Sequence, residues 1–241
     1  MMSSDYSQIA IREFHLFAGI GGGILGGMLN NHTCVGASEI DKFCKAVLEF
    51  RMNEGSLPAF DLFGDIRTLD GKPFRKTFDI LSGGFPCQPF SSAARGRNLE
   101  SKNMWPQMLR FALESEAPIV FAENVNPQPI LKAKHDLESF DYRVECCLLS
   151  ASDLGACHRR NRYWLLAYSN GNRELFSRIH DETRMLPKLR QGIWKGKLKD
   201  PRMANEFSNR LDKLKATGNA QVPVVAAVAF RILVSRLSSL T

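Results

Sequence analysis

The feature that most constrains the fold is a short apolar stretch that runs directly into a cluster of glycines. Residues 14–18 have the character of a buried strand, residues 19–23 contain four glycines, and an apolar helical segment continues to Leu29. A strand, a glycine-rich turn and a helix form the opening unit of nucleotide-binding α/β sheets, because glycines permit a tight turn and close approach of a cofactor. A glycine cluster alone is a weak sign, since many helices begin in this way.

A second unit places an acidic residue where a ribose would need one. Residues 34–38 form another short strand-like stretch, which ends in Glu39, about 20 residues beyond the start of the glycine turn. A carboxylate at this spacing can accept hydrogen bonds from ribose hydroxyls. Residues 41–50 then show the apolar period of a helix. A third unit ends in Asp65, whose carboxylate could receive the amino group of an adenine.

Cys87 lies in an unusual local sequence. A short apolar run at residues 78–81, which includes one Asp, leads to residues 83–91, which read Gly-Gly-Phe-Pro-Cys-Gln-Pro-Phe-Ser. Free cysteines are among the most buried residues in proteins, but prolines on both sides interrupt regular structure and stiffen the loop. We therefore expect Cys87 to be placed for chemistry and not for packing. The polar stretch at residues 88–102 is expected to be a mobile loop that closes over a substrate.

A fifth strand-like stretch, residues 118–122, ends in Glu123, Asn124 and Val125. The carboxyl ends of the strands in a parallel α/β sheet form the edge where ligands bind. Because the loop of Cys87 also follows a strand, Glu123 and Cys87 are expected at the same edge.

Two further strands are expected, at residues 142–149, with Cys146 and Cys147 in the core, and at residues 163–168. Three arginines, at positions 159, 160 and 162, come just before the last strand and require anionic or hydrogen-bonding partners if they are buried. The whole pattern predicts an α/β fold with a mostly parallel seven-stranded sheet and helices on both faces. Beyond the helices already described, helices are expected at residues 104–116, 127–137 and 224–237.

Charge is distributed unevenly along the 241 residues, whose formal net charge is +7. Residues 155–215 contain fifteen Lys or Arg and six Asp or Glu, so this segment carries +9 and the remainder carries −2. A basic segment on a nearly neutral body is typical of a protein that binds a polyanion; a solvated basic face is the alternative. We expect a main domain at residues 1–168, a small irregular basic lobe at 169–200, and a segment at 201–241 that returns to the main domain.

Composition also argues against several classes of protein. No run of eighteen apolar residues is present, and residues 1–6 lack the pattern of a signal peptide. The six cysteines include no C-x-x-C pair, and the five histidines show no ligand spacing. We therefore expect no metal site, no disulfide framework and a cytoplasmic location.

Taken together, and in this order, the motifs resemble those of the cytosine-C5 DNA methyltransferase family over nearly the whole chain. The resemblance implies a Rossmann-like class I methyltransferase fold with a reduced target-recognition lobe, and S-adenosylmethionine as methyl donor. It assigns catalysis to Cys87, Glu123, Arg160 and Arg162, with the thiolate of Cys87 attacking carbon 6 of a flipped-out cytosine. It assigns cofactor binding to Phe17, Ala18, Gly19, Ile20, Gly21, Gly22, Glu39, Ile40, Asp65, Ile66, Pro86, Asn219 and Ala220, and DNA binding to Phe85, Gln88, Ser91, Arg95, Arg97, Asn124 and His158.

Within that resemblance, Glu123 would be a carboxylic acid that hydrogen-bonds N3 of the base, which implies a raised pKa in a closed site. Arg162 would contact the base O2, and Arg160 would position the loop or a phosphate. The thiolate of Cys87 would require a pKa lowered by nearby cations.

Several positions depart from the family pattern. His15 stands where an acidic or small polar residue is frequent, so the amino-acid end of the cofactor is expected to be held differently. Cys157 and His158 replace the usual Pro-Gln. The lobe at residues 169–200 has about a third of the customary length or less, which predicts a short or degenerate target site because few side chains can reach base edges.

The resemblance further implies double-stranded DNA as partner, a monomer, S-adenosylhomocysteine as product, and a bacterial or phage-infected host cell. It leaves room for a cognate restriction enzyme or an additional recognition subunit. Two alternatives remain: a tRNA cytosine-C5 methyltransferase, and a catalytically idle relative that only binds DNA. The presence of every expected catalytic residue argues against the second alternative.

Overall fold

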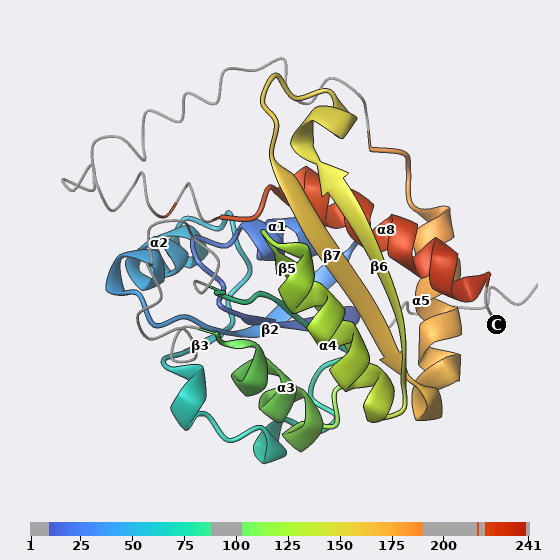
Figure 1. Cartoon of the computed structure of the whole chain (residues 1–241). Coiled ribbons are helices and arrows are strands. Elements are labelled where there is room, and N and C mark those ends of the chain that lie inside the picture. Colours follow the sequence, from blue (N-terminus) through green and yellow to red (C-terminus); the bar gives the residue numbers. More distant parts are fainter. Residues whose placement is uncertain (1–9, 88–102, 190–215, 217–219, 240–241) are drawn as a thin grey trace, which may run out of the picture.

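A computed structural model describes residues 10–87, 103–189, 216 and 220–239. Its described strands form one seven-stranded sheet in the order β3-β2-β1-β4-β5-β7-β6 (Figure 1). The neighbours from β3 to β5 pair in parallel, whereas β7 runs antiparallel to both β5 and β6. The predicted fold is therefore confirmed. The strands are β1 (Ile11–Leu16), β2 (His32–Ser38), β3 (Asp61–Phe63), β4 (Ile80–Gly84), β5 (Ile119–Asn124), β6 (Tyr142–Ser150) and β7 (Asn161–Ser169).

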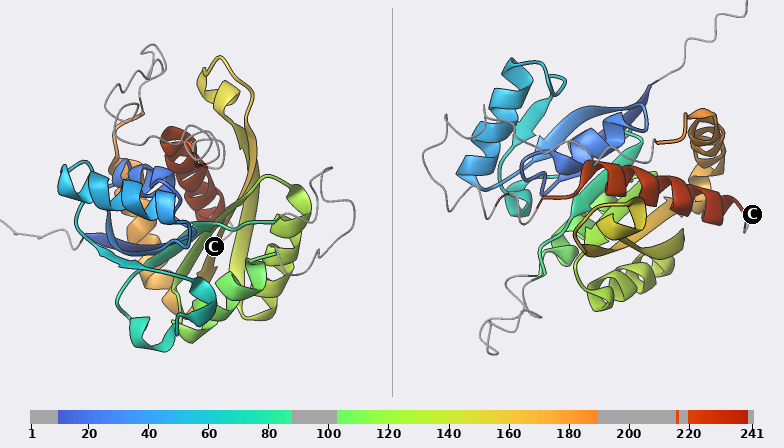
Figure 2. Two further views of the ribbon diagram at one scale, coloured as in Figure 1. Left: turned by 90° about the vertical axis from the view of Figure 1, so that its left-hand side faces the viewer. Right: turned by 90° about the horizontal axis from the view of Figure 1, so that it is seen from above.

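Helices cover both faces of the sheet. Since side chains alternate between the two faces along each strand, one strand packs against both layers of helices. In β7, Leu165 and Ala167 pack in one cluster with α3 and α4, whereas Trp164, Leu166 and Tyr168 pack in another with α5 and α8. Figure 2 shows α8 and α4 on opposite sides of the sheet. The described α-helices are α1 (Gly22–Met28), α2 (Lys42–Asn53), α3 (Trp105–Glu114), α4 (Pro127–Ser139), α5 (Arg173–Met185) and α8 (Pro223–Ser238).

The boundaries of two strands differ from those predicted. β1 ends at Leu16, two residues early, because Phe17 has a left-handed backbone conformation with φ of 54°. β4 begins at Ile80 and continues to Gly84, since residues 80–84 pair with residues 119–123 of β5. The sheet edge that follows β1 and β4 is therefore formed by the glycine turn and by the loop of Cys87.

The irregular structure predicted for residues 169–200 is wrong for residues 173–185, which form α5. This helix buries Phe176 and Ile179, three residues apart on one face, against the main body. The ring of Phe176 stacks on Tyr168 of β7, with 4.2 Å between the ring centroids. Charged residues on either side of these two apolar positions, and Arg178 between them, hid the helical period in the sequence. Residues 190–200 of the expected lobe lie outside the described residues, as does the loop at 88–102.

Cys146 and Cys147 are half-buried, not core residues as predicted, because β6 lies at the edge of the sheet. Their side chains point to opposite faces: Cys146 packs beside the cluster of α3 and α4, and Cys147 beside that of α5 and α8. All six cysteines are free thiols.

Candidate active site

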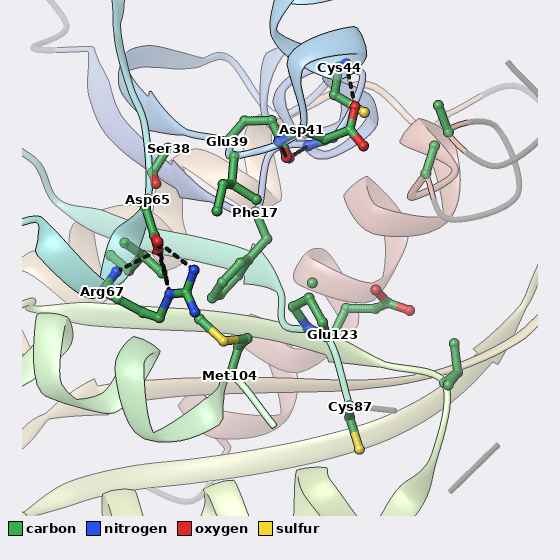
Figure 3. Close-up of a pocket in the computed structure, with 18 of the residues that line it drawn as sticks. Phe17, Ser38, Glu39, Asp41, Cys44, Asp65, Arg67, Cys87, Met104 and Glu123 are labelled. Atoms are coloured by element: carbon green, nitrogen blue, oxygen red, sulfur yellow. Dashed lines mark hydrogen bonds and ion pairs between the residues drawn. The ribbon is translucent and has the colours of Figure 1, made fainter. Parts of the chain in front are cut away.

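The carboxyl ends of the parallel strands surround a pocket of about 720 Å³. Figure 3 shows Cys87 and Glu123 on one side of this pocket and Glu39, Asp41 and Asp65 on the other. The structure thus brings together residues that are far apart in the sequence. Of the residues expected in the site, those that line the pocket are Phe17, Gly19, Glu39, Ile40, Asp65, Ile66, Pro86, Cys87, Glu123, Arg162 and Ala220.

Glu39 is a buried carboxylate that holds the glycine turn against the start of α2. Its Oε2 accepts a hydrogen bond from the backbone N–H of Gly19 at 2.7 Å, and its Oε1 accepts one from the N–H of Asp41 at 2.8 Å. Asp41 in turn caps α2 by accepting hydrogen bonds from the backbone N–H groups of Phe43 and Cys44. Each oxygen of a carboxylate has more than one acceptor position. Glu39 can therefore hold the turn and still accept a hydrogen bond from a ligand in the pocket.

Asp65 follows β3 and is paired with Arg67, a residue that the sequence did not single out. The guanidinium of Arg67 donates to Asp65 through Nε at 2.8 Å, and its Nη2 lies 2.6 Å from Oδ2. The hydrogen bonds from Arg67 hold the pKa of Asp65 below its ordinary value. Asp65 is therefore an ionised acceptor at the pocket wall, with Arg67 beside it.

The loop of Cys87 is held in place by backbone contacts on both sides of the cysteine. Cys87 forms an isolated antiparallel bridge with Asn103, and the carbonyl of Pro86 accepts a hydrogen bond from the N–H of Met104 at 3.0 Å. Partial burial raises the pKa of the Cys87 thiol. This direction is opposite to the expected lowering, because among the described residues burial outweighs any stabilisation of the thiolate by cations.

Glu123 lies near the end of β5, directly beside Gly84 in the register of the sheet, so it neighbours the strand that leads to Cys87. Arg162 Nε lies 2.7 Å from Glu123 Oε1. Burial nevertheless raises the pKa of the Glu123 carboxyl, against the opposing effects of Arg162, Gln221 and Arg160. The direction agrees with the expectation of a raised pKa. Glu123 is therefore a buried carboxyl that keeps its proton at a higher pH than an ordinary carboxylic acid.

Arg160 connects the start of β7 to the returning C-terminal segment. Its Nη2 donates to the carbonyl of Ala220 at 2.7 Å, and its backbone N–H donates to Ser150 Oγ at 3.0 Å. Burial, and then the proximity of Arg162, lower the pKa of Arg160. Both arginines therefore have a partner in a residue that lines the pocket: Arg160 contacts the carbonyl of Ala220, and Arg162 contacts the carboxyl of Glu123.

Asn124 and Phe85, two residues expected to contact DNA, contact each other. Asn124 and Phe85 are buried, and the side-chain amide of Asn124 donates to the carbonyl of Phe85 at 2.9 Å. This bond fastens the Cys87 loop to β5. His158 lies on an exposed turn. The other expected positions Gln88, Ser91, Arg95, Arg97 and Asn219 lie outside the described residues.

His15 lies beneath the glycine turn in a buried polar network. Its Nδ1 is 2.7 Å from Ser82 Oγ, and its Nε2 is 3.6 Å from the carboxylate of Glu13, which also pairs with His32 at 2.9 Å. His15 is not among the residues that line the pocket. It therefore lies behind the glycine turn and not at the pocket surface.

The glycine turn also receives the C-terminal segment. Of its residues, Ile20 packs with Val47 and Ala216, and the N–H of Ala18 donates to the carbonyl of Ser38 at 3.1 Å. A Cβ atom on Gly22 would overlap the carbonyl oxygen of Gln221. Gly22 is therefore required for close approach of two backbones, an observation that no sequence pattern could supply.

Gly22→Ala is expected to lower the free energy of unfolding by about 1–3 kcal/mol, the usual cost of forcing extra atoms into a packed site. The overlap is with backbone, so a side-chain rotation cannot relieve it. Thermal or urea denaturation would measure the change. Gly171→Ala is the matched control, since nothing lies within 4 Å of the added Cβ. Equal stability of the two variants would contradict the close packing of the C-terminal segment on the turn.

Among the described residues, no group of three or more His, Cys, Asp or Glu side chains is arranged to hold a metal ion. In the same part of the chain, no helix combines the length and the apolar character needed to cross a membrane.

The doubly covered parallel sheet, with a pocket at its carboxyl edge formed by a glycine turn, two acidic residues and a cysteine loop, defines a Rossmann-like α/β protein of the nucleotide-binding type. More narrowly, the chain belongs to the C-5 cytosine-specific DNA methylase family, whose model matches residues 11–225. The family indicated by the sequence motifs is thus confirmed.

Curated relatives include two bacterial type II methyltransferases. M.MspI of Moraxella sp. is 33% identical over an alignment of 180 residues, and the match covers 70% of this chain and 40% of the relative. M.HhaI of Haemophilus parahaemolyticus is 30% identical over an alignment of 175 residues, and the match covers 69% of this chain and 51% of the relative. The chain thus spans about half, or less, of the length of these relatives.

Two solved structures share the fold. A putative DNA modification methyltransferase encoded within an E. coli prophage has a TM-score of 0.55 and 24% identity, and the match covers 68% of this chain and 48% of that one. A DNMT2 variant from Spodoptera frugiperda has a TM-score of 0.54 and 22% identity, with 67% and 50% covered. At these identities the likeness concerns the fold.

Proposed function

We propose that the chain transfers a methyl group from S-adenosylmethionine to carbon 5 of cytosine in DNA. The observation that carries the proposal is the meeting of Cys87 and Glu123, a buried carboxyl with a raised pKa, in one pocket with the glycine turn and the carboxylates of Glu39 and Asp65. Family membership supports the same reaction. The target is proposed to be a short or degenerate site on double-stranded DNA.

The pocket residues fit the methyl donor. A volume of about 720 Å³ is sufficient for a nucleoside-sized ligand. Glu39 would accept hydrogen bonds from the ribose hydroxyls, and Asp65 would accept one from the adenine amino group. Ile40, 60% exposed at the pocket wall, offers an apolar surface for the adenine ring. When bound, S-adenosylmethionine supplies an electrophilic methyl group.

Cys87 and Glu123 would act together on the base. Carbon 5 of cytosine is a poor nucleophile until the thiolate of Cys87 forms a bond to carbon 6, which places electron density on carbon 5. A protonated Glu123 would donate a hydrogen bond to N3 and draw charge out of the ring. After methylation the proton on carbon 5 leaves to a base such as water, the bond between sulfur and carbon 6 breaks, and Cys87 is regenerated as a thiolate.

Arg162 and Arg160 would position the groups that react. Arg162, already beside Glu123, would reach O2 of the cytosine, and Arg160 would hold the C-terminal segment against the pocket. Such a reaction requires the cytosine to leave the DNA duplex, because Cys87 lies in a pocket of the protein and cannot reach carbon 6 of a base that is stacked in the double helix.

Incubation with S-adenosylmethionine labelled in the methyl group, and with either unmethylated DNA or unmodified tRNA, tests this proposal. Label is expected in DNA, at carbon 5 of cytosine, and bisulfite sequencing of a treated plasmid would give the site. Label confined to tRNA would reject DNA as substrate in favour of the tRNA alternative. Binding to DNA with no label in either nucleic acid would favour an idle relative.

A further inference from the structure

Gln221 lies where the C-terminal segment meets the sheet, two residues before α8. Its side-chain amide extends across the glycine turn toward the end of β4. An added Cβ on Gly23 would lie 2.5 Å from Gln221 Oε1, and one on Gly84 would lie 3.1 Å from Gln221 Nε2. The amide therefore spans the distance between the glycine turn and the strand that leads to Cys87.

The carboxyl of Glu123, on β5, also lies beside Gly84. A Cβ on Gly84 would lie 2.6 Å from Glu123 Oε2, so this oxygen and Gln221 Nε2 share the space above one glycine. The nearby side-chain amide of Gln221 also lowers the pKa of Glu123, against the effect of burial, as a donor facing the carboxylate would. Arg162 lies at the other oxygen, Oε1. The carboxyl is thus held between a cation on β7 and a neutral amide on the C-terminal segment.

We propose that Gln221 is a positioning residue for Glu123: its amide fixes the orientation of the carboxyl and links it to the segment that packs on the glycine turn. This inference rests on the proposed function. An amide is suited to this role because its N–H group can donate to a carboxylate, and its carbonyl, after the amide turns over, can accept from a carboxylic acid. Of these two states Gln221 favours the carboxylate, since its effect is to lower the pKa of Glu123.

The same segment is coupled to the cofactor side of the pocket. Ala220, next to Gln221, lines the pocket and is held by Arg160, while the backbone of Gln221 packs on Gly22. Movement of this segment would thus shift both the cofactor turn and the partner of Glu123. The catalytic carboxyl and the cofactor site are connected through one short stretch of chain.

The first test measures the protonation of Glu123 directly, without reference to activity. The full chain is labelled with ¹³C at the glutamate carboxyls, and the Glu123 signal is identified by its loss in Glu123→Gln. In Gln221→Met, which keeps the length and the unbranched shape of the side chain, the Glu123 pKa is expected to rise by about one unit, because a donor to the carboxylate is lost. Gln221→Glu is expected to raise it further through like-charge repulsion. The charged groups facing Glu123, Arg162 and Arg160, are unchanged in both variants.

The second test compares single-turnover methyl transfer. Gln221→Met is expected to slow the transfer by about tenfold or more, with the KM for S-adenosylmethionine nearly unchanged. Gln128→Met makes the same chemical change at an exposed glutamine and is expected to behave as the wild type. A Glu123 pKa and a transfer rate that are both unchanged in Gln221→Met, with an active wild type, would overturn the inference. If instead the wild type transfers no methyl group to cytosine while the pKa still responds to Gln221→Met, the proposed function fails and the contact stands.

Discussion

Cys87→Ser is expected to lose methyl transfer by at least about 1,000-fold, as is common when an enzyme loses its nucleophile, and to keep its affinity for DNA. A serine hydroxyl is far less acidic than a thiol and is a much weaker nucleophile toward carbon 6. The substitution changes one half-buried atom, and the backbone contacts that hold the loop, from Pro86 to Met104 and from Cys87 to Asn103, do not depend on it.

Transfer of labelled methyl groups to DNA and fluorescence anisotropy with labelled duplex would separate the two properties. Cys146→Ser is the matched control, because Cys146 is also half-buried but lies on the edge strand β6 and does not line the pocket. Retained transfer in Cys87→Ser would show that the nucleophile is misassigned.

The raised pKa of Cys87 also bears on how the rate of methyl transfer depends on pH. Burial alone disfavours the thiolate in the described part of the chain, so the thiolate must gain stabilisation when substrate binds, or the rate must increase with pH toward the thiol pKa. The sequence motif predicts that Cys87 is the cysteine that reacts. It could not indicate the electrostatic environment of the sulfur, because that depends on the groups that surround the loop in space.

The elements that the sequence predicted well are those fixed by local pattern. Buried parallel strands are short apolar runs, and β5 was found with Glu123 and Asn124 at its end because the acidic residue interrupts such a run. The closing helix α8 was found because it is apolar over most of its length. Helix α5 was missed because its buried pair, Phe176 and Ile179, is surrounded by charged residues.

The sequence could predict which residues meet in the site only where a motif lies at the end of a strand, because the strand order then fixes its place in space. Cys87 and Glu123 were placed at one edge of the sheet from the order of strands alone, and they line one pocket. The ion pair between Asp65 and Arg67 and the contact of Gln221 with Glu123 could not be predicted, since each depends on side-chain direction. The hydrogen bond from Asn124 to the carbonyl of Phe85 could not be predicted for the same reason, and the contact of Asn124 with DNA stays a prediction.

Glu123→Gln is expected to lower methyl transfer by about 100- to 10,000-fold at neutral pH, the usual contribution of a positioned acid or base. The amide keeps the size of the side chain but cannot supply the proton. The size of the defect should depend on pH. Because wild-type Glu123 loses its proton as the pH rises through its raised pKa, and the variant has no proton to lose, the ratio of the two rates is expected to decrease toward alkaline pH.

Stability provides a check on the same group that needs no activity. A carboxyl whose pKa is raised in the folded state binds more protons folded than unfolded, so its contribution to stability is present below the unfolded pKa of about 4.3 and is lost as the pH rises through the folded value. Relative to the wild type, Glu123→Gln should therefore become more stable as the pH rises from about 4 through the folded pKa, as measured by urea denaturation at each pH. A stability difference that does not vary with pH, together with a rate defect that does not vary either, would show that the pKa of Glu123 is not raised and that the group is ionised at neutral pH. In that case the carboxylate could only accept hydrogen bonds, and the assistance at N3 would have to come from another group.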